Sequence, residues 1–335
     1  MRRRTLIFGL TAAAAGAGVV AACDSQADLG TAAGETSTAP ILGSTTASSL
    51  GPRRVTSVYA PTPGVAPAAS FAVGKRMYAG FARGAARPLP TTVWYPAQGV
   101  AAPTGPAPVD DAAPATGRFP LILFSHGLTA QPADYASMLS RWAQSGFVVA
   151  GPTYPHTHYD ADGFDENDIV NQPADATSVI DQLLALDPAD PLRAAINSDR
   201  IAAAGHSAGG ITTVGLFSAA RDKRLKAGVV LAGTDFQGAP FTGPTAAMLF
   251  IHGRRDNTVT WQAGHTVFEA VPWSRAMLTI TDGGHVTEAP DFEATTQTST
   301  QFLWYALYGD PTAKAAIPTA AATGNVATLE NQLSS

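Results

Sequence analysis

Cysteine is almost absent from this chain: the 335 residues contain one, Cys23. A single thiol cannot form an intramolecular disulfide, so the fold must be held by its hydrophobic core even if the protein is exported. Because Cys23 lies in a predicted N-terminal leader, a cysteine nucleophile is also excluded from the domain that follows.

Charge is scarce as well, at 14% of residues, and the formal net charge is −5. This balance gives no reason to expect nucleic acid as a partner, since basic residues cluster only at the extreme N-terminus. The chain has no internal repeat and no G-x-x-x-x-G-K-[ST] phosphate loop, and we expect no cofactor. The hydrophobic content of 45% is typical of a soluble globular protein with an ample core.

Residues 1–22 are predicted to be an export signal. Arg2–Arg4 form a positive segment, and Leu6–Val20 form a short apolar core rich in alanine and glycine. Arg3–Ile7 resembles the twin-arginine export signal, and Val20–Cys23 resembles the lipobox of bacterial lipoproteins. We therefore expect lipidation of Cys23, membrane contact through this lipid, and an exported protein, either a cell-surface lipoprotein or secreted. The alternatives are an incidental cysteine and a membrane-spanning helix, for which the apolar run is short.

The remaining chain divides by composition into three parts. Residues 23–54 are rich in Ala, Gly, Ser and Thr and are predicted to be a disordered tether. Residues 55–310 are predicted to form one domain, and residues 311–335 a loose C-terminal tail. The sequence does not predict the oligomeric state.

Apolar strands alternate with amphipathic helices throughout the predicted domain. The expected strands are 71–81, 89–97, 119–125, 147–151, 201–204, 227–232, 246–251 and 276–281, and the expected helices are 132–146, 173–186, 208–220, 260–270 and 295–308. This alternation predicts an α/β fold, with a mostly parallel central sheet covered by helices on both faces. In such sheets, reactive groups gather beyond the carboxyl ends of the strands.

Gly205–Gly209, with the sequence GHSAG, matches the G-x-S-x-G nucleophile elbow. An apolar strand precedes it and a helix-compatible run follows it, which is the context that this motif requires. The turn would hold Ser207 in a strained conformation and project its hydroxyl above the start of the helix. Glycine is common in this chain and a chance match is possible, so the assignment depends on the partners of Ser207.

A serine hydroxyl needs a base to take its proton, and a carboxylate to orient that base. Of the seven histidines, His285 is the predicted base because it follows the last strand in a Gly-Gly turn. Asp256 is the predicted partner, because it follows the strand 246–251 and gives the order Ser, Asp, His. Asp235 is the rival carboxylate, and a salt bridge to Arg254 or Arg255 is the alternative role for Asp256.

The oxyanion of a tetrahedral intermediate needs backbone N–H donors. Ala208 offers one at the start of the helix, and Leu128 offers a second from the loop after the strand 119–125. Each donor lowers the barrier by roughly 3 kcal/mol. Because Leu128 would act through its backbone, replacement by another residue except proline should be tolerated.

Together these segments resemble the α/β-hydrolase superfamily, over about residues 70–310. The segments that carry this resemblance are FPLILFSHG ending at Gly127, the GHSAG elbow, HGRRD ending at Asp256, and Gly283–His285. Within the superfamily, the chain is similar to bacterial cutinase-like polyester (PET) hydrolases, with the strand Leu89–Pro96 and the turn Gly127–Ala130 as shared features. It is also similar to platelet-activating-factor acetylhydrolases and dienelactone-hydrolase-like esterases. The resemblance implies a serine esterase with Ser207, Asp256 and His285 as catalytic triad and Leu128 and Ala208 as oxyanion hole. Two departures are the absence of paired cysteines and Ala208, where polyester hydrolases usually have methionine.

The segment between residues 232 and 246 is too short for a large helical cap, so we expect an open cleft. An open cleft favours lipid-like, bulky or polymeric esters reached from the surface. His206, Tyr154 and Phe236 are the candidate substrate-contacting residues. The acidic segment 160–168 could hold calcium, but its spacing is not that of an EF-hand, and a solvated acidic loop is the preferred interpretation, with no metal site.

The sequence thus predicts a carboxylic ester hydrolase that acts through an acyl-enzyme intermediate on a small or polymeric ester. Two alternatives remain open. One is a serine peptidase of the same fold, although the chain has no room for a substrate-filtering domain. The other is a non-catalytic surface lipoprotein, although binding alone would not require Ser207, Asp256 and His285 together.

Overall fold

A computed structural model describes residues 54–102, 105–286 and 289–333 of this chain. The predicted export signal, the lipidation site Cys23 and almost all of the predicted tether lie outside these residues. Within the described part, no helix combines the length and the apolarity needed to cross a membrane.

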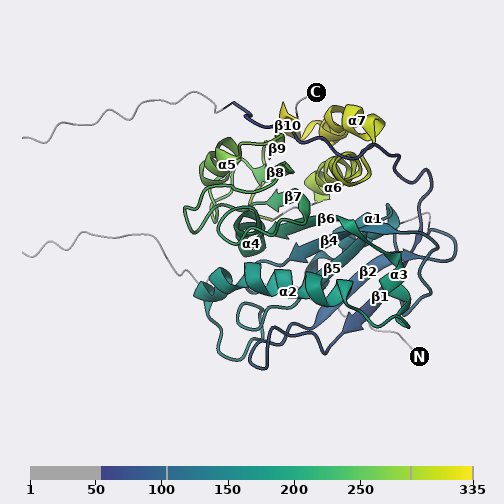
Figure 1. Cartoon of the computed structure of the whole chain (residues 1–335). Coiled ribbons are helices and arrows are strands. Elements are labelled where there is room, and N and C mark those ends of the chain that lie inside the picture. Colours follow the sequence, from purple (N-terminus) through teal and green to yellow (C-terminus); the bar gives the residue numbers. More distant parts are fainter. Residues whose placement is uncertain (1–53, 103–104, 287–288, 334–335) are drawn as a thin grey trace, which may run out of the picture. The chain divides into compact units, whose positions relative to one another are not determined.

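A ten-stranded sheet runs through the described domain (Figure 1), in the order β10-β9-β8-β7-β6-β4-β5-β2-β1-β3. Six neighbouring strands, from β9 to β5 in this order, are parallel, and β10, β2 and β1 add antiparallel pairings. The strands are β1 (Ala72–Tyr78), β2 (Thr91–Ala97), β3 (Val109–Asp110), β4 (Phe119–Ser125), β5 (Val148–Pro152), β6 (Ile196–His206), β7 (Leu225–Leu231), β8 (Ala247–Gly253), β9 (Arg275–Ile280) and β10 (Ala327–Gln332). The expected mostly parallel sheet is confirmed.

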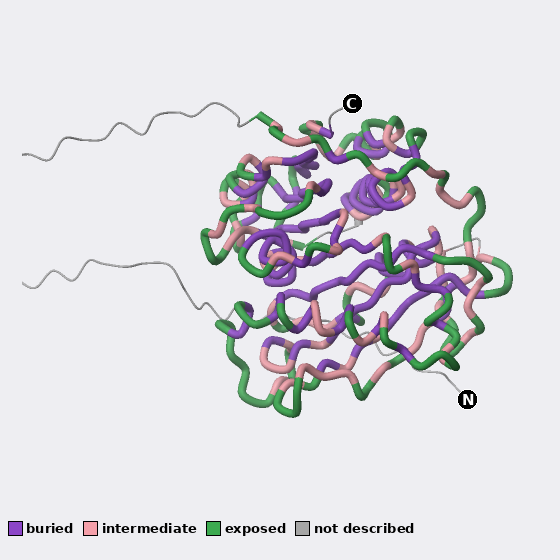
Figure 2. The backbone as a smooth tube through the Cα atoms, viewed as in Figure 1, coloured by how far each residue is buried: buried purple, intermediate pink, exposed green. Residues whose placement is uncertain are grey.

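The central strands are apolar on both faces because both faces are covered. All seven residues of β4 are buried, and the same holds for β8. Successive side chains of a strand point to opposite faces, so Leu121 and Leu123 enter one core while Ile122 and Phe124 enter the other. Figure 2 shows the buried strands running through the middle of the domain.

Helices cover the two faces of the sheet. Trp142, Phe302 and Ile317, from α1, α6 and α7, pack in one core, whereas Val179, Phe217 and Phe268, from α2, α4 and α5, pack in the other. The α-helices are α1 (Ala136–Gln144), α2 (Gln172–Leu184), α3 (Pro191–Ala195), α4 (Ala208–Phe217), α5 (Trp261–Ala270), α6 (Ala289–Leu303) and α7 (Pro311–Ala321). Short turns of other helix types are η1 (Pro132–Tyr135), η2 (Glu166–Asn171), η3 (Trp304–Tyr308) and η4 (Thr323–Asn325).

The prediction of a loose tail after residue 310 is wrong. Asp310 caps α7 by accepting from the N–H groups of Thr312 and Ala313. Farther on, β10 pairs with β9 along six residues and completes the edge of the sheet. The alanine-rich composition of this segment hid both elements, since small residues such as Ala313 and Ala321 can be buried without an obvious apolar stripe.

The segment between β7 and β8 contains no helix, as expected from its length. No cap therefore rises from this connection over the carboxyl ends of the parallel strands.

Candidate active site

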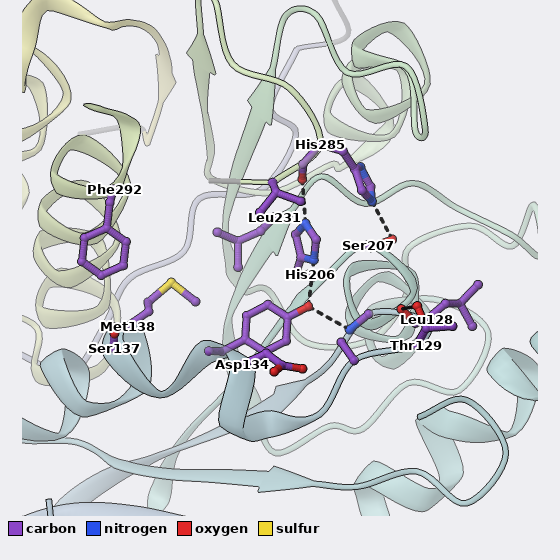
Figure 3. Close-up of a pocket in the computed structure, with 14 residues that line it drawn as sticks. Leu128, Thr129, Asp134, Ser137, Met138, His206, Ser207, Leu231, His285 and Phe292 are labelled. Carbon is purple, nitrogen blue, oxygen red and sulfur yellow. Dashed lines mark hydrogen bonds between the residues drawn. The ribbon is translucent and has the colours of Figure 1, made fainter. Parts of the chain in front are cut away.

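Three parallel strands deliver the three predicted triad residues to one edge of the sheet. Ser207 follows β6, Asp256 follows β8 and His285 follows β9. The Nε2 atom of His285 lies 2.9 Å from Ser207 Oγ, and its Nδ1 atom lies 2.8 Å from Asp256 Oδ2. The structure thus brings these residues, which span about eighty positions of the chain, into one hydrogen-bonded chain (Figure 3 shows its Ser207–His285 link).

The turn at Ser207 is strained in the way that the elbow requires. Ser207 has φ of 56° and ψ of −119°, a conformation that L-residues rarely adopt. A Cβ atom at Gly205 would collide with the backbone of Gly209, and one at Gly209 would collide with Ser125. Both glycines are therefore needed for the close contact between β6, α4 and the end of β4.

Asp256 is buried, at 4% exposure, and accepts several hydrogen bonds. Burial alone would raise the pKa of this carboxyl. The hydrogen bonds from His252 and His285 and from the N–H of Thr258 outweigh burial and hold the pKa well below its usual range. Asp256 is therefore a carboxylate at neutral pH and fixes a proton on Nδ1 of His285, which leaves Nε2 free to accept from Ser207. His252 also donates to the carbonyl of Val259, so its Nε2 atom contacts both this carbonyl and the carboxylate of Asp256.

Several hydrogen bonds hold the backbone of the loop after β4. His126 Nδ1 lies 2.7 Å from the carbonyl oxygen of Gly127, and the N–H of Thr129 donates to Thr157 over 2.8 Å. Because C=O and N–H point in opposite directions across a peptide, fixing the Gly127 carbonyl also fixes the direction of the Leu128 N–H. Within the described part of the chain, this N–H has no protein acceptor. Thr129 has a φ of 54°, a positive value that strains its backbone at this turn.

A cavity of about 390 Å³ opens beside Ser207. Its lining is mostly apolar and consists of Gly127, Leu128, Thr129, Ala130, Asp134, Tyr135, Ser137, Met138, His206, Ser207, Leu231, His285, Val286 and Phe292. In Figure 3, Ser207 and Leu128 lie at one end of this lining, and Met138 of α1 and Phe292 of α6 lie at the other. Among the described residues, the lining includes one acidic side chain, that of Asp134, and no lysine or arginine.

The structure places the three predicted substrate-contacting residues in different environments. His206 does line the cavity, and its ring points away from Ser207 toward Tyr135 and the carbonyl of His285. Tyr154 is the second residue after β5. Its side chain is fully buried in the core, where its hydroxyl hydrogen-bonds Ser125. Phe236 is 55% exposed beside Ile169 in a small depression apart from the cavity. Contrary to the prediction, Tyr154 and Phe236 are therefore not part of the cavity lining beside Ser207.

The rival carboxylate and the acidic segment have partners outside the triad. Asp235 accepts from the N–H of Gln237 and does not reach His285. In the acidic segment, Asp168 pairs with Arg87, and Asp160 with His158. The described residues contain no cluster of side chains suited to a metal ion.

Among the residues of the cavity lining that the sequence did not assign to the site are Tyr135, Met138 and Phe292. The apolar stripe of the helix 132–146 indicated that Tyr135 and Met138 face inward, but a stripe does not distinguish a core from a cavity wall. Phe292 comes from the first turns of α6, which begins six residues before its predicted start. No sequence signal placed it near Ser207.

Taken together, the mostly parallel sheet, the strained elbow and the Ser207–His285–Asp256 chain define an α/β-hydrolase fold. The family model described as Chlorophyllase matches residues 79–239, a little under half of the chain. The matched segment includes the loop after β4 and the elbow at Ser207 but ends before Asp256 and His285. No curated protein matches the sequence. The fold and the family likeness identify the protein as a carboxylic ester hydrolase.

Proposed function

We propose that Ser207 is the nucleophile of a serine esterase that acts through an acyl-enzyme on uncharged, apolar esters. The observation that carries this proposal is the continuous chain from Ser207 through His285 to Asp256, at the edge of an apolar cavity. The residue roles follow from this geometry.

In the acylation step, Nε2 of His285 accepts the proton of Ser207 while the serine oxygen attacks the ester carbonyl. The imidazolium that forms is stabilised by the carboxylate of Asp256, which keeps its negative charge. The oxygen of the tetrahedral intermediate receives hydrogen bonds from the N–H groups of Leu128 and Ala208. His285 then protonates the departing alkoxide, and the alcohol leaves.

In the deacylation step, water takes the place of the alcohol. His285 accepts a proton from this water, the hydroxide adds to the acyl carbonyl, and the same two N–H groups hold the oxyanion. The bond to Ser207 then breaks, and Ser207 recovers its proton from His285. The carboxylic acid product leaves as an anion, and Asp134 at the cavity disfavours its retention by like charge.

The cavity favours neutral substrates with an apolar chain. Met138, Leu231 and Phe292 offer hydrocarbon and aromatic surface, whereas the described residues of the lining include no cationic side chain that could bind a substrate carboxylate. A substrate that carries a carboxylate next to its ester, as a dienelactone does, is therefore disfavoured. The absence of a helix between β7 and β8 leaves the site open to lipid-like esters and to polyester chains.

A p-nitrophenyl ester series from two to twelve carbons tests this proposal, with the Ser207→Ala variant as control. We expect hydrolysis in the wild type, none above background in the variant, and labelling of the wild type alone by a fluorophosphonate. Turnover of amides alone would instead indicate a peptidase, and inertness toward both reagents would indicate a binding protein. A polyester film, a phospholipid with a short acyl chain, and chlorophyll, to which the family name refers, complete the substrate panel.

The chain-length preference can be altered at Ser137, an exposed residue of α1 that lines the cavity. Ser137→Trp should fill part of the space without disturbing the core, and so shift the preferred acyl chain to fewer carbons. Ser137→Ala is the matched control and should leave the profile unchanged. An identical profile for the tryptophan variant would mean that the chain binds elsewhere.

We also propose that the protein is exported and held at the cell surface by a lipid on Cys23. This rests on the sequence of residues 1–23 alone. Growth with an alkyne fatty acid, followed by click labelling, should mark the wild type and not the Cys23→Ser variant. Equal absence of label from both would exclude the anchor.

A further inference from the structure

A hydrogen-bonded bridge crosses the cavity lining between two loops that the proposed mechanism needs. The N–H of Gly127 donates to Tyr135 Oη over 3.1 Å, Tyr135 Oη lies 2.9 Å from His206 Nδ1, and His206 Nε2 lies 2.7 Å from the carbonyl oxygen of His285. In Figure 3, dashed lines mark these hydrogen bonds, including the one between His206 and the backbone of His285.

Each proton in this bridge has one possible place. The carbonyl of His285 can only accept, so Nε2 of His206 carries the hydrogen. Burial lowers the pKa of His206 to about 4, so at neutral pH the ring has one proton and Nδ1 is an acceptor. Burial also raises the pKa of Tyr135 to about 12, so its hydroxyl keeps its proton and donates it to Nδ1. The tyrosine oxygen is then free to accept from Gly127.

The bridge joins the loop that contains Gly127 to the turn that contains His285. Gly127 precedes Leu128, whose N–H must point at the oxyanion. His285 follows Gly283 and Gly284. The N–H of Arg255 donates to the carbonyl of Gly283, whereas a Cβ atom at Gly284 would meet nothing within 4 Å, so the bridge adds a contact at the His285 end of this turn. Among the described residues, no hydrogen bond runs directly between residues 127–129 and residues 283–286.

We propose that Tyr135 and His206 are positioning residues whose bridge ties the oxyanion loop to the loop that carries the general base. The carbonyl of His285 is fixed at one end, which sets the reach of its imidazole toward Ser207. The N–H of Gly127 is fixed at the other end. Because His126 contacts the carbonyl of Gly127, both peptide groups of this residue are then held, and the N–H of Leu128 keeps its direction. Neither side chain takes or gives a proton in the reaction. This inference rests on the proposed function of Ser207 and His285.

A bridge of this kind supports the transition state more than the bound substrate, so its loss should reduce kcat and leave KM nearly unchanged. With p-nitrophenyl butyrate, Tyr135→Phe should lower kcat by about tenfold or more, since loss of a whole oxyanion donor costs about 100- to 1,000-fold. A trifluoromethyl ketone, which forms an oxyanion on the serine, should bind Tyr135→Phe more weakly by a similar factor. Tyr59→Phe is the matched control: its buried hydroxyl donates to Ala306 away from the site, and kcat should stay within about twofold.

Substitutions of His206 test the bridge from its other side. His206→Leu removes both hydrogen bonds and should match the loss in Tyr135→Phe, whereas His206→Gln keeps one donor and one acceptor and should recover most of kcat. The double variant Tyr135→Phe/His206→Leu should be no worse than the poorer single variant, because one broken link already interrupts the bridge. If Tyr135→Phe does not fold, the comparison of the leucine and glutamine variants still decides.

The proposal is overturned if Tyr135→Phe and His206→Leu keep kcat within twofold, if their losses lie in KM, or if the losses multiply in the double variant. Ser207→Ala is assayed in parallel. If it stays active, the proposed function fails, and with it this inference. If it is inert while the bridge variants are fully active, the bridge alone is refuted.

Discussion

Acid should destabilise this protein through two histidines that the fold keeps neutral. His126 accepts from the N–H of Tyr154 and contacts the carbonyl of Gly127, and His206 lies in the bridge described above. Burial lowers the pKa of both side chains to about 4. In the unfolded chain the same groups have pKa values near 6.5. Above that value neither state carries the proton, so the two groups contribute no pH dependence.

Below pH 6.5 the unfolded chain binds protons that the folded protein refuses. The free energy of unfolding therefore falls as the pH drops from about 6.5 to about 4, by up to 1.4 kcal/mol per pH unit for each histidine. Between pH 7 and pH 5 this amounts to about 2 kcal/mol per residue and about 4 kcal/mol for both. Such a loss is a large fraction of the 5–15 kcal/mol typical of folded domains.

The window from pH 7 to pH 5 also separates the histidines from the carboxylates. The pKa of Asp256 is lowered in the folded state, so its contribution is present above the unfolded value near 4 and is lost only as the pH falls below it. The pKa of Asp168 is lowered too: burial raises it, but the hydrogen bond from Arg87 outweighs burial. Neither group contributes to a change above pH 5.

Urea unfolding at pH 7, 6 and 5 measures this effect directly. The wild type should lose about 4 kcal/mol over the range from these two side chains, and His206→Gln should remove about half of the loss. An NMR titration of the imidazole carbons should show His126 and His206 still neutral at pH 5. A pH-independent free energy of unfolding, or a midpoint near 6.5 for either ring, would refute the reasoning.

Three further substitutions follow from the contacts. Asp256→Asn should lower kcat by about three to four orders of magnitude, because an amide N–H facing Nδ1 of His285 imposes the wrong tautomer; stopped ester assays measure the loss. Arg87→Ala should reduce the free energy of unfolding by about 3 kcal/mol, because it leaves the fully buried carboxylate of Asp175 without its closest ion pair; urea unfolding at pH 7 measures this. Leu128→Ala should keep kcat within about threefold, because the oxyanion donor is the backbone N–H.

A control variant or a contradicting outcome tests each of these three predictions. Arg255→Ala breaks an exposed pair with Asp282 and should cost less than about 1 kcal/mol. A comparable loss from Arg87→Ala would show that the buried pair adds nothing special. Retention of more than a tenth of kcat by Asp256→Asn would contradict the role of the carboxylate. A hundredfold loss in Leu128→Ala would show that the side chain, and not the N–H, is needed.

The local sequence was enough to predict eight of the strands, all except β3 and β10, and to name candidate residues at their ends. A strand such as FPLILFS is apolar on both of its faces, so both faces must be buried. Such strands, alternating with helices along the chain, predicted the parallel sheet. The glycines around Ser207 permit a turn that few other residues could adopt. Because parallel strands end at the same edge, Asp256 and His285 could be placed near Ser207 before any coordinates were known.

Only the tertiary structure decided which side chains surround the hydrogen-bonded chain of Ser207, His285 and Asp256. Tyr154 and Phe236 follow strands at the same edge as Ser207, yet one turns into the core and the other toward solvent, because loop paths depend on packing that no local pattern encodes. The bridge of Tyr135 and His206, and the pairing of β10 with β9, join segments far apart in sequence. Strand periodicity is a property of neighbouring residues, whereas the walls of a cavity are set by contacts between distant ones.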